Sequence, residues 1–460
     1  MSTDSGDDSH RTSTGAAPAA PEGPAPSAAG GPADGPPSER RFRTFDSLID
    51  VPAFRWYILA MTGNWGALQM QQVARGFLAY EITGSFAALG FLELANSMPR
   101  VVLALYGGVL ADRLSRRAII QTGQALVAVF AAVIAVLLFT DNLKFEHLIF
   151  ATIAQGIVNS FVLPARQSMI PEIVGVNRVM NAFALNVFVL NVVRLAAPAL
   201  AGVLIAVAGP SWVFALMAVM NVLAVLALFP VPITNARTRA ALANGGSTEA
   251  PAAPTKKDRA GLRAMAETLA YLKTEHVLIW LLLIHGLSST LSLPYQRLLP
   301  GFVREVLSTD ADQAAVRIGL LLTMTAVGAL VGSLLIASLP SRRQGKLLIA
   351  SMVIFGVALM AFSASEVLWL SMAIVLVLGV GQAGRQSLVN IMIQTRVSDA
   401  YRGRVSSIML LDDGVESLGI FGIALLAEVV GPQWALGAVG LALVGMGAFL
   451  WAARVIRDLD

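Results

Sequence analysis

The stretch Gly108-Val109-Leu110-Ala111-Asp112-Arg113-Leu114-Ser115-Arg116-Arg117 places a group of charged residues directly between two long apolar runs. An apolar run of about 20 residues is long enough to cross a bilayer as a helix. The stretch therefore predicts two membrane-spanning helices joined by a very short loop. Basic residues gather on the cytoplasmic side of membrane proteins, so this loop is expected to lie in the cytoplasm.

The composition agrees with a membrane protein. Hydrophobic residues make up 56% of the chain and charged residues only 13%, against about 25% charged in a typical soluble protein. The apolar runs are continuous and not alternating, which favours helices over a β-barrel. Cysteine is absent from the 460 residues, which excludes disulfides, a thiol nucleophile and a Cys-rich metal site.

The apolar runs from Phe54 onward predict twelve transmembrane helices. We place them at residues 54–82, 85–110, 117–140, 146–169, 178–208, 211–231, 276–300, 314–339, 346–364, 366–395, 405–430 and 433–453. Basic residues are concentrated in the loops that follow even-numbered spans, which is the positive-inside pattern and not a nucleic-acid-binding patch. We expect a multi-pass protein of the cell inner (plasma) membrane with both termini in the cytoplasm.

Two segments differ from the apolar spans. Residues 1–40 are rich in Pro, Ala, Gly and Ser and predict a disordered N-terminal tail. Residues 233–274 predict a cytoplasmic linker, and the apolar residues within 262–273 have the spacing of an amphipathic helix on the membrane surface. The linker divides the spans into a six-helix bundle at 41–232 and a second at 275–460.

A weak internal repeat relates the two bundles. Arg166-Gln167-Ser168-Met169-Ile170, near the end of span four, is echoed by Arg385-Gln386-Ser387-Leu388-Val389 in span ten. The charged loop has a partial counterpart after span eight, where the two arginines are retained and the aspartate is not. Repeated halves are how many secondary transporters are built.

Four motifs carry a resemblance to a known family. They are the charged loop at 108–117, Tyr80-Glu81-Ile82-Thr83-Gly84-Ser85, Pro164-Ala165-Arg166-Gln167 and Arg402-Gly403-Arg404-Val405. Together they resemble the exporter branch of the major facilitator superfamily, which includes the enterobactin exporter and drug-efflux permeases. The resemblance implies an all-α membrane protein with twelve transmembrane helices in two pseudo-symmetric six-helix bundles, the major facilitator fold.

The resemblance also implies a cytoplasmic gate. In that family the acid matching Asp112 stabilises the outward-open state, and basic residues hold the loop against neighbouring helices. The Asp112 carboxylate is placed to accept hydrogen bonds from the first turn of span eleven, or to pair with Arg166. The alternative is a loop that serves only to orient the chain. The candidate gating residues are Gly108, Asp112, Arg113, Arg116, Arg117, Arg166 and Arg404.

Charged residues inside the spans indicate mechanism, because each costs about 2.5–3.5 kcal/mol at mid-helix on insertion scales. Arg75 and Glu93 lie equally far from the Gly84 turn, so we expect them to pair between neighbouring helices. Polar residues on the same faces extend this pair into a cluster, which makes Glu93 a candidate for proton exchange. A purely structural salt bridge is the alternative.

Span eleven carries Asp412, Asp413 and Glu416 within an apolar stretch. Arg385 in span ten lies at a similar depth and is expected to pair with Asp412 or Asp413. At least one acid would then remain unpaired, and an unpaired carboxyl in an apolar environment suits a proton carrier. The alternative is a static network that holds spans ten and eleven together.

The remaining polar residues in the spans are candidates for a substrate cavity. They are Asn64, Gln71, Arg75, Asn96, Arg100, Asn191 and Arg194. Arg100 and Arg194 would leave a positive cavity suited to an anionic or phenolic substrate. Neighbouring Phe and Met residues would equally suit an amphipathic drug, and the sequence does not decide between the two.

We therefore predict a secondary active transporter and not an enzyme. Within that class we predict a proton-coupled exporter of a small amphipathic molecule, either a drug or a siderophore-like compound, that works by alternating access. An uptake permease for a small organic solute and a non-transporting membrane receptor are the alternatives. The four histidines form no ligand pair and no phosphate-binding loop is encoded, so no metal and no cofactor is predicted. The expected partners are the substrate, protons and the lipid bilayer, with no nucleic acid, and the chain is expected to be a monomer.

Overall fold

The computed structural model describes residues 46–113, 115–175, 178–232, 275–308, 310–339, 343–454 and 456–457. The side chains of 46–47, 104–113, 276, 399–400, 402–404 and 406–413 are not among those described. The predicted tail at 1–40 and the predicted linker at 233–274 lie outside the described residues.

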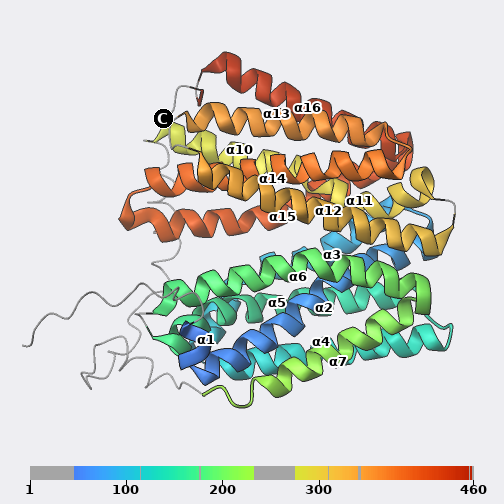
Figure 1. The fold of residues 1–460 in the computed structure, drawn as a ribbon, viewed down its shortest axis with the longest axis vertical. Helices are drawn as coiled ribbons and strands as arrows, with labels where there is room; N and C mark the ends of the chain where they lie inside the picture. The colour runs from blue at the N-terminus through green and yellow to red at the C-terminus, as the bar shows by residue number, and fades with distance from the viewer. Residues whose placement is uncertain are drawn as a thin grey trace, which may run out of the picture. The chain divides into compact units, whose positions relative to one another are not determined.

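The described part of the chain is helical, and Figure 1 shows its helices as two groups, α1–α7 and α10–α16. The first group comprises α1 (Asp46–Asp50), α2 (Pro52–Thr83), α3 (Phe86–Arg113), α4 (Arg116–Phe139), α5 (Phe145–Val174), α6 (Val179–Ala208) and α7 (Pro210–Ala227). The second comprises α10 (His276–Ser292), α11 (Pro294–Phe302), the π-helical turn η3 (Val303–Leu307), α12 (Ala311–Ser338), α13 (Gln344–Ser363), α14 (Leu368–Arg396), α15 (Asp399–Val430) and α16 (Pro432–Ala453). We call these groups the first and second halves.

The predicted spans correspond to these helices. Ten described helical segments are long and apolar enough to cross a membrane. The other two predicted spans are α2 and α15, each 32 residues long, which carry more polar and charged residues than the rest. The predicted span at 276–300 is interrupted, because α10 ends at Ser292 and α11 begins at Pro294.

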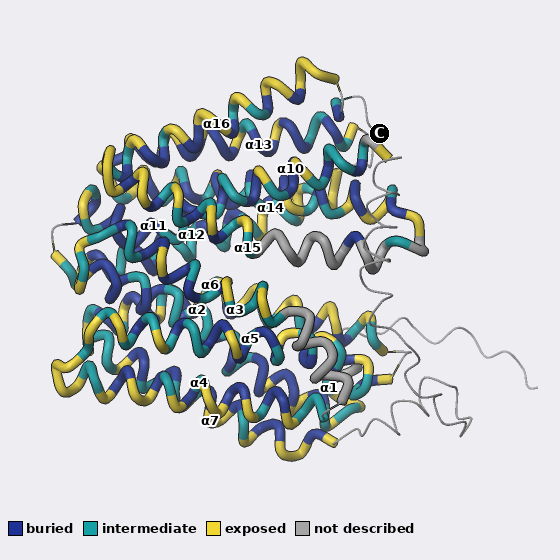
Figure 2. The backbone as a smooth tube through the Cα atoms, turned by 180° about the vertical axis from the view of Figure 1, so that it is seen from behind, coloured by how far each residue is buried: buried dark blue, intermediate teal, exposed yellow. Residues whose placement is uncertain are grey.

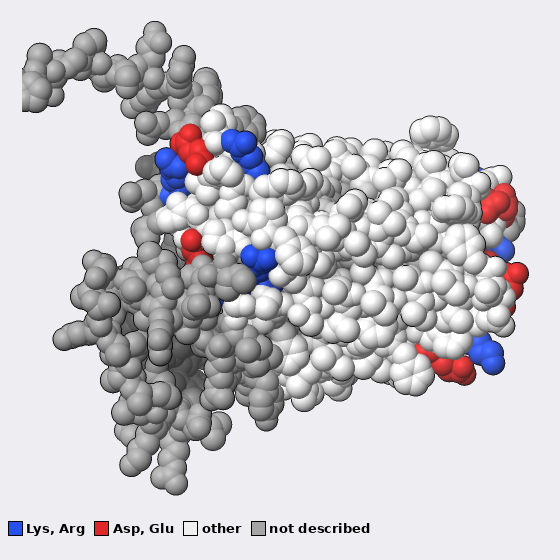
Figure 3. Space-filling view, turned by 90° about the horizontal axis from the view of Figure 1, so that it is seen from below, with Lys and Arg blue, Asp and Glu red and all other residues white. Residues whose placement is uncertain are grey.

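The surface is that of a protein surrounded by lipid. On α4, Val129, Val133 and Val136 recur at helical spacing and are each about half-exposed. Figure 2 shows exposed residues along the outward sides of α4, α7 and α16, and buried residues within each half. In Figure 3 the middle of the visible face is free of charge over the described residues, and charged side chains gather at its two ends.

The packing of the helices repeats between the halves. In the first half α3 packs against α5 and α4 against α7, and in the second half α12 packs against α14 and α13 against α16. The halves meet along two corresponding seams, α3 with α15 and α6 with α12. A pseudo-twofold relation between the halves accounts for this pattern, because it exchanges one seam with the other.

A pair of Gly-Pro turns is a further mark of the repeat. Gly209-Pro210 joins α6 to α7, and Gly431-Pro432 joins α15 to α16. The two glycines have φ values of 89° and 86°, a region that residues with a Cβ atom rarely adopt. Proline then begins the next helix, where its missing N–H leaves no hydrogen bond unmade. The sequence analysis overlooked this correspondence.

Candidate transport site and gates

Arg75 on α2 and Glu93 on α3 form a buried ion pair. The Arg75 Nη2 atom donates to Glu93 Oε1 at 2.7 Å, and each residue is only 8% exposed. The tight turn at Gly84 makes α2 and α3 neighbours, so residues equally far from it lie at one depth. The pairing predicted from the sequence is therefore present.

A third charged residue joins this pair from the second half. Arg297 on α11 places its Nε atom 3.5 Å from Glu93 Oε2. The three charged residues line a small cavity of about 20 Å³, together with Gln72, Gly76, Leu89, Leu92, Gln296 and Pro300. Sequence reasoning missed Arg297, because it compared depths only between helices adjacent in the chain.

Asn64 belongs to a different cluster from Arg75. The Arg166 Nη2 atom on α5 donates to Asn64 Oδ1 at 2.6 Å, and Asn64 Nδ2 donates to Asn221 Oδ1 on α7 at 3.2 Å. The Arg166 guanidinium also lies 4.7 Å from the centre of the Trp65 ring, a cation–π contact. The structure thus divides the predicted polar cluster in two, since Asn64 faces the core of the first half and not Arg75.

Two further predicted cavity residues lie apart from both clusters. Gln71 lines a separate cavity of about 10 Å³ together with Gln155, whose Oε1 atom is buried without a hydrogen-bond partner among the described residues. Asn96 lies where Gly156 of α5 approaches the backbone of α3. Its Oδ1 atom also has no partner among the described residues.

Arg385 on α14 is buried against three serines of α10. Its Nη1 atom donates to Ser288 Oγ at 2.6 Å and to Ser289 Oγ at 3.4 Å, and its Nη2 atom donates to Ser292 Oγ at 2.9 Å. The predicted partners Asp412 and Asp413 have side chains outside the described set, so that pairing stays a prediction. Glu416 is partly buried on α15 and acts electrostatically on Arg385.

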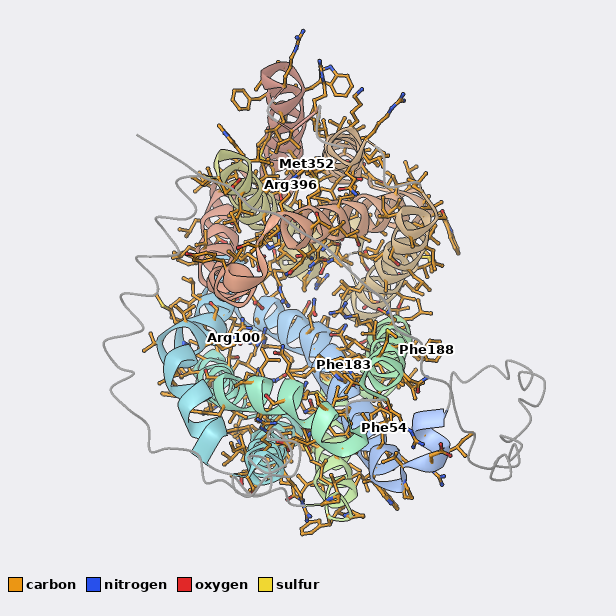
Figure 4. All side chains as sticks on the ribbon, turned by 90° about the vertical axis from the view of Figure 1, so that its left-hand side faces the viewer. Phe54, Arg100, Phe183, Phe188, Met352 and Arg396 are labelled. Carbon is orange, nitrogen blue, oxygen red and sulfur yellow. The ribbon has the colours of Figure 1, made fainter. Side chains whose placement is uncertain are left out.

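Arg194 and Asn191 lie exposed on α6, and Arg100 is partly buried on α3. In Figure 4, Arg100, Phe183 and Phe188 lie on the side of the first half that is nearer to the second, whereas Phe54 lies away from it. Phe183 and Phe188 are 38% and 59% exposed. These residues thus combine positive charge with apolar area on one border of the first half.

The basic residues of the charged loop hold it against α5 and against the segment that follows α7. Arg116 donates to the carbonyl of Ser168 at 2.7 Å and forms an ion pair with Glu172. Arg117 donates to the carbonyl of Val231 and lies 5.5 Å from the centre of the Phe229 ring. The side chains of Asp112, Arg113 and Arg404 and the burial of Gly108, the other candidates in this region, are outside the described set. We call this end of the helices the Arg116 end.

At the opposite end, which we call the Gly84 end, polar contacts join the two halves. Glu428 on α15 accepts hydrogen bonds from Phe86 N at 2.6 Å, from Ala87 N at 3.1 Å and from Ser85 Oγ at 3.1 Å. A carboxylate is thereby placed at the N-terminus of α3, where the helix dipole and unpaired N–H groups favour negative charge.

Two more contacts at the Gly84 end involve η3. The Tyr80 hydroxyl donates to Glu305 Oε1, and Arg304 Nε donates to Glu81 Oε1 at 2.8 Å. Sequence reasoning missed both contacts and the Glu428 cap. No local pattern links these residues, because each contact joins segments more than 200 positions apart.

The fold is that of known transporters. A crystal structure of a mutant form of the nucleoside transporter NupG superimposes with a TM-score of 0.67 at 14% identity, covering 89% of this chain and all of that one. Together with the lipid-facing surface and the charged residues buried between helices, this likeness defines an all-helical integral membrane protein with the major facilitator fold.

Residues 47–459 match the family described as transmembrane secretion effectors, and the chain belongs to that family of major facilitator transporters. Such transporters are not enzymes. The predicted superfamily, fold and non-enzymatic class are thereby confirmed.

Individual relatives are distant and are named as transporters or exporters. The chain is 21% identical over 375 residues to the staphyloferrin A transporter of Staphylococcus aureus, covering 81% of this chain and 88% of that protein. It is 25% identical over 402 residues to the multidrug efflux pump Tap of Mycobacterium tuberculosis, with 84% and 90% covered. It is 24% identical over 403 residues to the enterobactin exporter EntS of Citrobacter koseri, with 87% and 91% covered.

Proposed function

We propose that this transporter exports a small amphipathic molecule in exchange for protons by alternating access. The observation that carries this proposal is Glu93, a carboxylate buried between helices and held by arginines from both halves. A buried acid that contacts both halves changes its surroundings whenever the halves move. That is what coupling proton exchange to transport requires.

Glu93 is the first candidate for the exchanging acid, because it is the one described acid that is buried within the helices. Glu416, Asp412 and Asp413 on α15 remain candidates, with Arg385 as the neighbouring cation. The exchange of one proton per transport cycle supplies enough free energy for export. One charge moving through 100 mV contributes about 2.3 kcal/mol, which sustains a gradient of about fortyfold.

We propose that the Arg116 end faces the cytoplasm and the Gly84 end the outside, with both termini cytoplasmic. The basic residues predicted to flank the spans at the Arg116 end support this orientation. The cytoplasmic gate would then comprise the charged loop with Arg166 and Arg404. The contacts of Glu428, Glu305 and Glu81 would close the outer side in the conformation seen here.

The proposed substrate site lies between a first bundle at 41–232 and a second at 275–460, joined by the linker at 233–274. Its candidate residues are Arg75, Asn96, Arg100, Asn191 and Arg194, whereas Asn64 and Gln71 lie within the first half. Among the described residues of this site Arg75, Arg100 and Arg194 are cations, and Glu93 is the neighbouring acid. This surplus favours an anionic or phenolic substrate, and two of the relatives are named for siderophores. The exposed aromatic residues of α6 suit an amphipathic drug, and one relative is named for several drugs.

The test is uptake into inverted membrane vesicles, which corresponds to export from the cell. Fluorescent amphipathic cations and an anionic siderophore are each offered with and without an imposed pH gradient. We expect gradient-dependent accumulation of at least one probe, its loss in Glu93→Gln and its retention in Glu366→Gln, which removes an exposed acid at the Gly84 end. Accumulation that is unchanged by the gradient or by Glu93→Gln would refute proton exchange at Glu93.

A further inference from the structure

We propose that Arg297 is the residue that couples the protonation of Glu93 to the conformation of the protein. This inference rests on the proposed function and adds the element that links proton to movement. Arg75 and Glu93 both belong to the first half and move together. Arg297 belongs to the second half, so its contact with Glu93 at 3.5 Å depends on how the halves are arranged.

The packing of α11 against α2 and α3 shows how the contact between Arg297 and Glu93 would be lost. Pro300 packs on Gly76 of α2, and a Cβ atom at Gly76 would come within 2.8 Å of its ring. A Cβ atom at Gly301 would come still closer to the rings of Tyr80 and Phe86, which leave no room for it. For the substrate to reach the Gly84 end, α11 has to move away from α2 and α3. Because Arg297 lies three residues before Pro300 on the same short helix, it is withdrawn from Glu93 by the same movement.

Of the charged residues around Glu93, Arg297 is the one that changes its distance from Glu93 when the two halves move apart. Arg75 on α2, Arg297 on α11 and Arg100 on α3 itself are the charged groups that act on Glu93 among the described residues. The other described neighbours of α3 near Glu93 are uncharged. They include the side chains of Phe421 and Ala424 on α15, and Gly156 on α5. Arg75 and Arg100 stay with Glu93 in the first half when the halves separate.

The proton step follows from this arrangement. With Arg297 in contact, the Glu93 carboxylate is stabilised by cations from both halves. With Arg297 withdrawn, one cation is lost, which favours the protonated carboxyl. A hydronium ion then transfers its proton to a Glu93 oxygen and becomes water, and the reverse transfer restores the carboxylate when Arg297 returns. The cavity of about 20 Å³ beside the pair has room for the water molecule that delivers the proton.

The experiment uses the full chain in lipid nanodiscs. Since the chain has no cysteine, Val207→Cys and Val429→Cys introduce one pair of spin labels at corresponding positions before the two Gly-Pro turns, where each valine is 82% exposed. Distances between the labels are recorded at pH 8 and pH 5. We expect acid to raise the ratio of separated to close label pairs about tenfold, which corresponds to about 1.4 kcal/mol.

Three variants in this background decide the inference. Glu93→Gln is expected to abolish the pH response. Arg297→Gln is expected to abolish it too, because protonation then no longer distinguishes the two conformations. Arg317→Gln is the control, and it is expected to retain the response because Arg317 on α12 donates to Gln313 and is not among the charged groups that act on Glu93. If Arg297→Gln does not assemble, Arg297→Met removes the charge and keeps an apolar stem.

The outcomes separate the inference from the proposed function. A pH response that survives in Arg297→Gln and is lost in Glu93→Gln would overturn the role of Arg297 and leave Glu93 as the exchanging acid. A response that survives in Glu93→Gln, together with intact proton-driven transport in vesicles, would overturn the proposed role of Glu93 itself. Absence of any pH response in the parent protein would also overturn the inference.

Discussion

Removing the Glu428 carboxylate should open the Gly84 end. In the structure Glu428 accepts two backbone N–H groups of α3 and the Ser85 hydroxyl, all from the opposite half. Replacing an N-cap acceptor by alanine costs about 0.5–2 kcal/mol, and the loss of a charge at a helix N-terminus adds about 0.3–1 kcal/mol. Because Glu428 is exposed, we take about 1–2 kcal/mol in total. Glu428→Ala should therefore raise the population open at this end about five- to thirtyfold.

The assay measures access to Leu89, which is 3% exposed and lines the cavity beside Glu93. With Leu89→Cys as the only cysteine, a membrane-impermeant maleimide added from the Gly84 side reacts only when this end opens. We expect Glu428→Ala to raise the reaction rate five- to thirtyfold and Glu366→Ala, an exposed acid at the same end, to leave it unchanged. A rate in Glu428→Ala within twofold of the parent would refute the assignment of Glu428 as a closing contact.

Two further predictions concern stability, and both are measured by thermal unfolding of the purified protein in detergent. Gly202→Ala should lower the stability by about 1–3 kcal/mol, because the new Cβ atom would meet the backbone of Ala315 on α12, whereas Gly422→Ala, with open space around it, should not lower it. An equal melting temperature for the two variants would contradict the close approach of α6 and α12. Ser292→Ala should cost about 1–3 kcal/mol because it leaves a buried donor of Arg385 unpaired. Ser338→Ala, at an exposed serine, should change little, and an effect of Ser338→Ala as large as that of Ser292→Ala would show that the cost does not come from Arg385.

The sequence predicted the features that depend on local periodicity. Long apolar runs predicted the spans, and the equal distance of Arg75 and Glu93 from the Gly84 turn predicted their pairing. Both inferences use residues on one helix or on two helices joined by a short turn. Arg297 was missed because α11 meets α2 and α3 across the two halves, and no local pattern encodes that contact.

Arg385 shows a second limit of reasoning by depth alone. The predicted partners Asp412 and Asp413 were chosen because acids attract arginine. That pairing stays a prediction, and sequence reasoning missed three neutral hydroxyls of α10 that accept hydrogen bonds from the guanidinium. Serines at positions i, i+1 and i+4 in an apolar helix were visible in the sequence. Their significance depends on which helix they face, and that is fixed only by the tertiary packing.

The two seams between the halves correspond by pseudo-symmetry but differ in chemistry. Where α6 meets α12, Gly202 and Gly319 allow the backbones to approach closely, and the contact is mainly apolar apart from the hydrogen bond from Thr323 to the carbonyl of Leu195. The α3–α15 seam and the neighbouring α11 and η3 instead carry the Glu428 cap and the ion pairs of Glu93 and Glu81. Apolar contacts in lipid do not respond to pH or to a charged substrate, whereas carboxylates do. Protons and a charged substrate can therefore change the relative free energies of the conformations through the carboxylate contacts on the α3 side of the molecule.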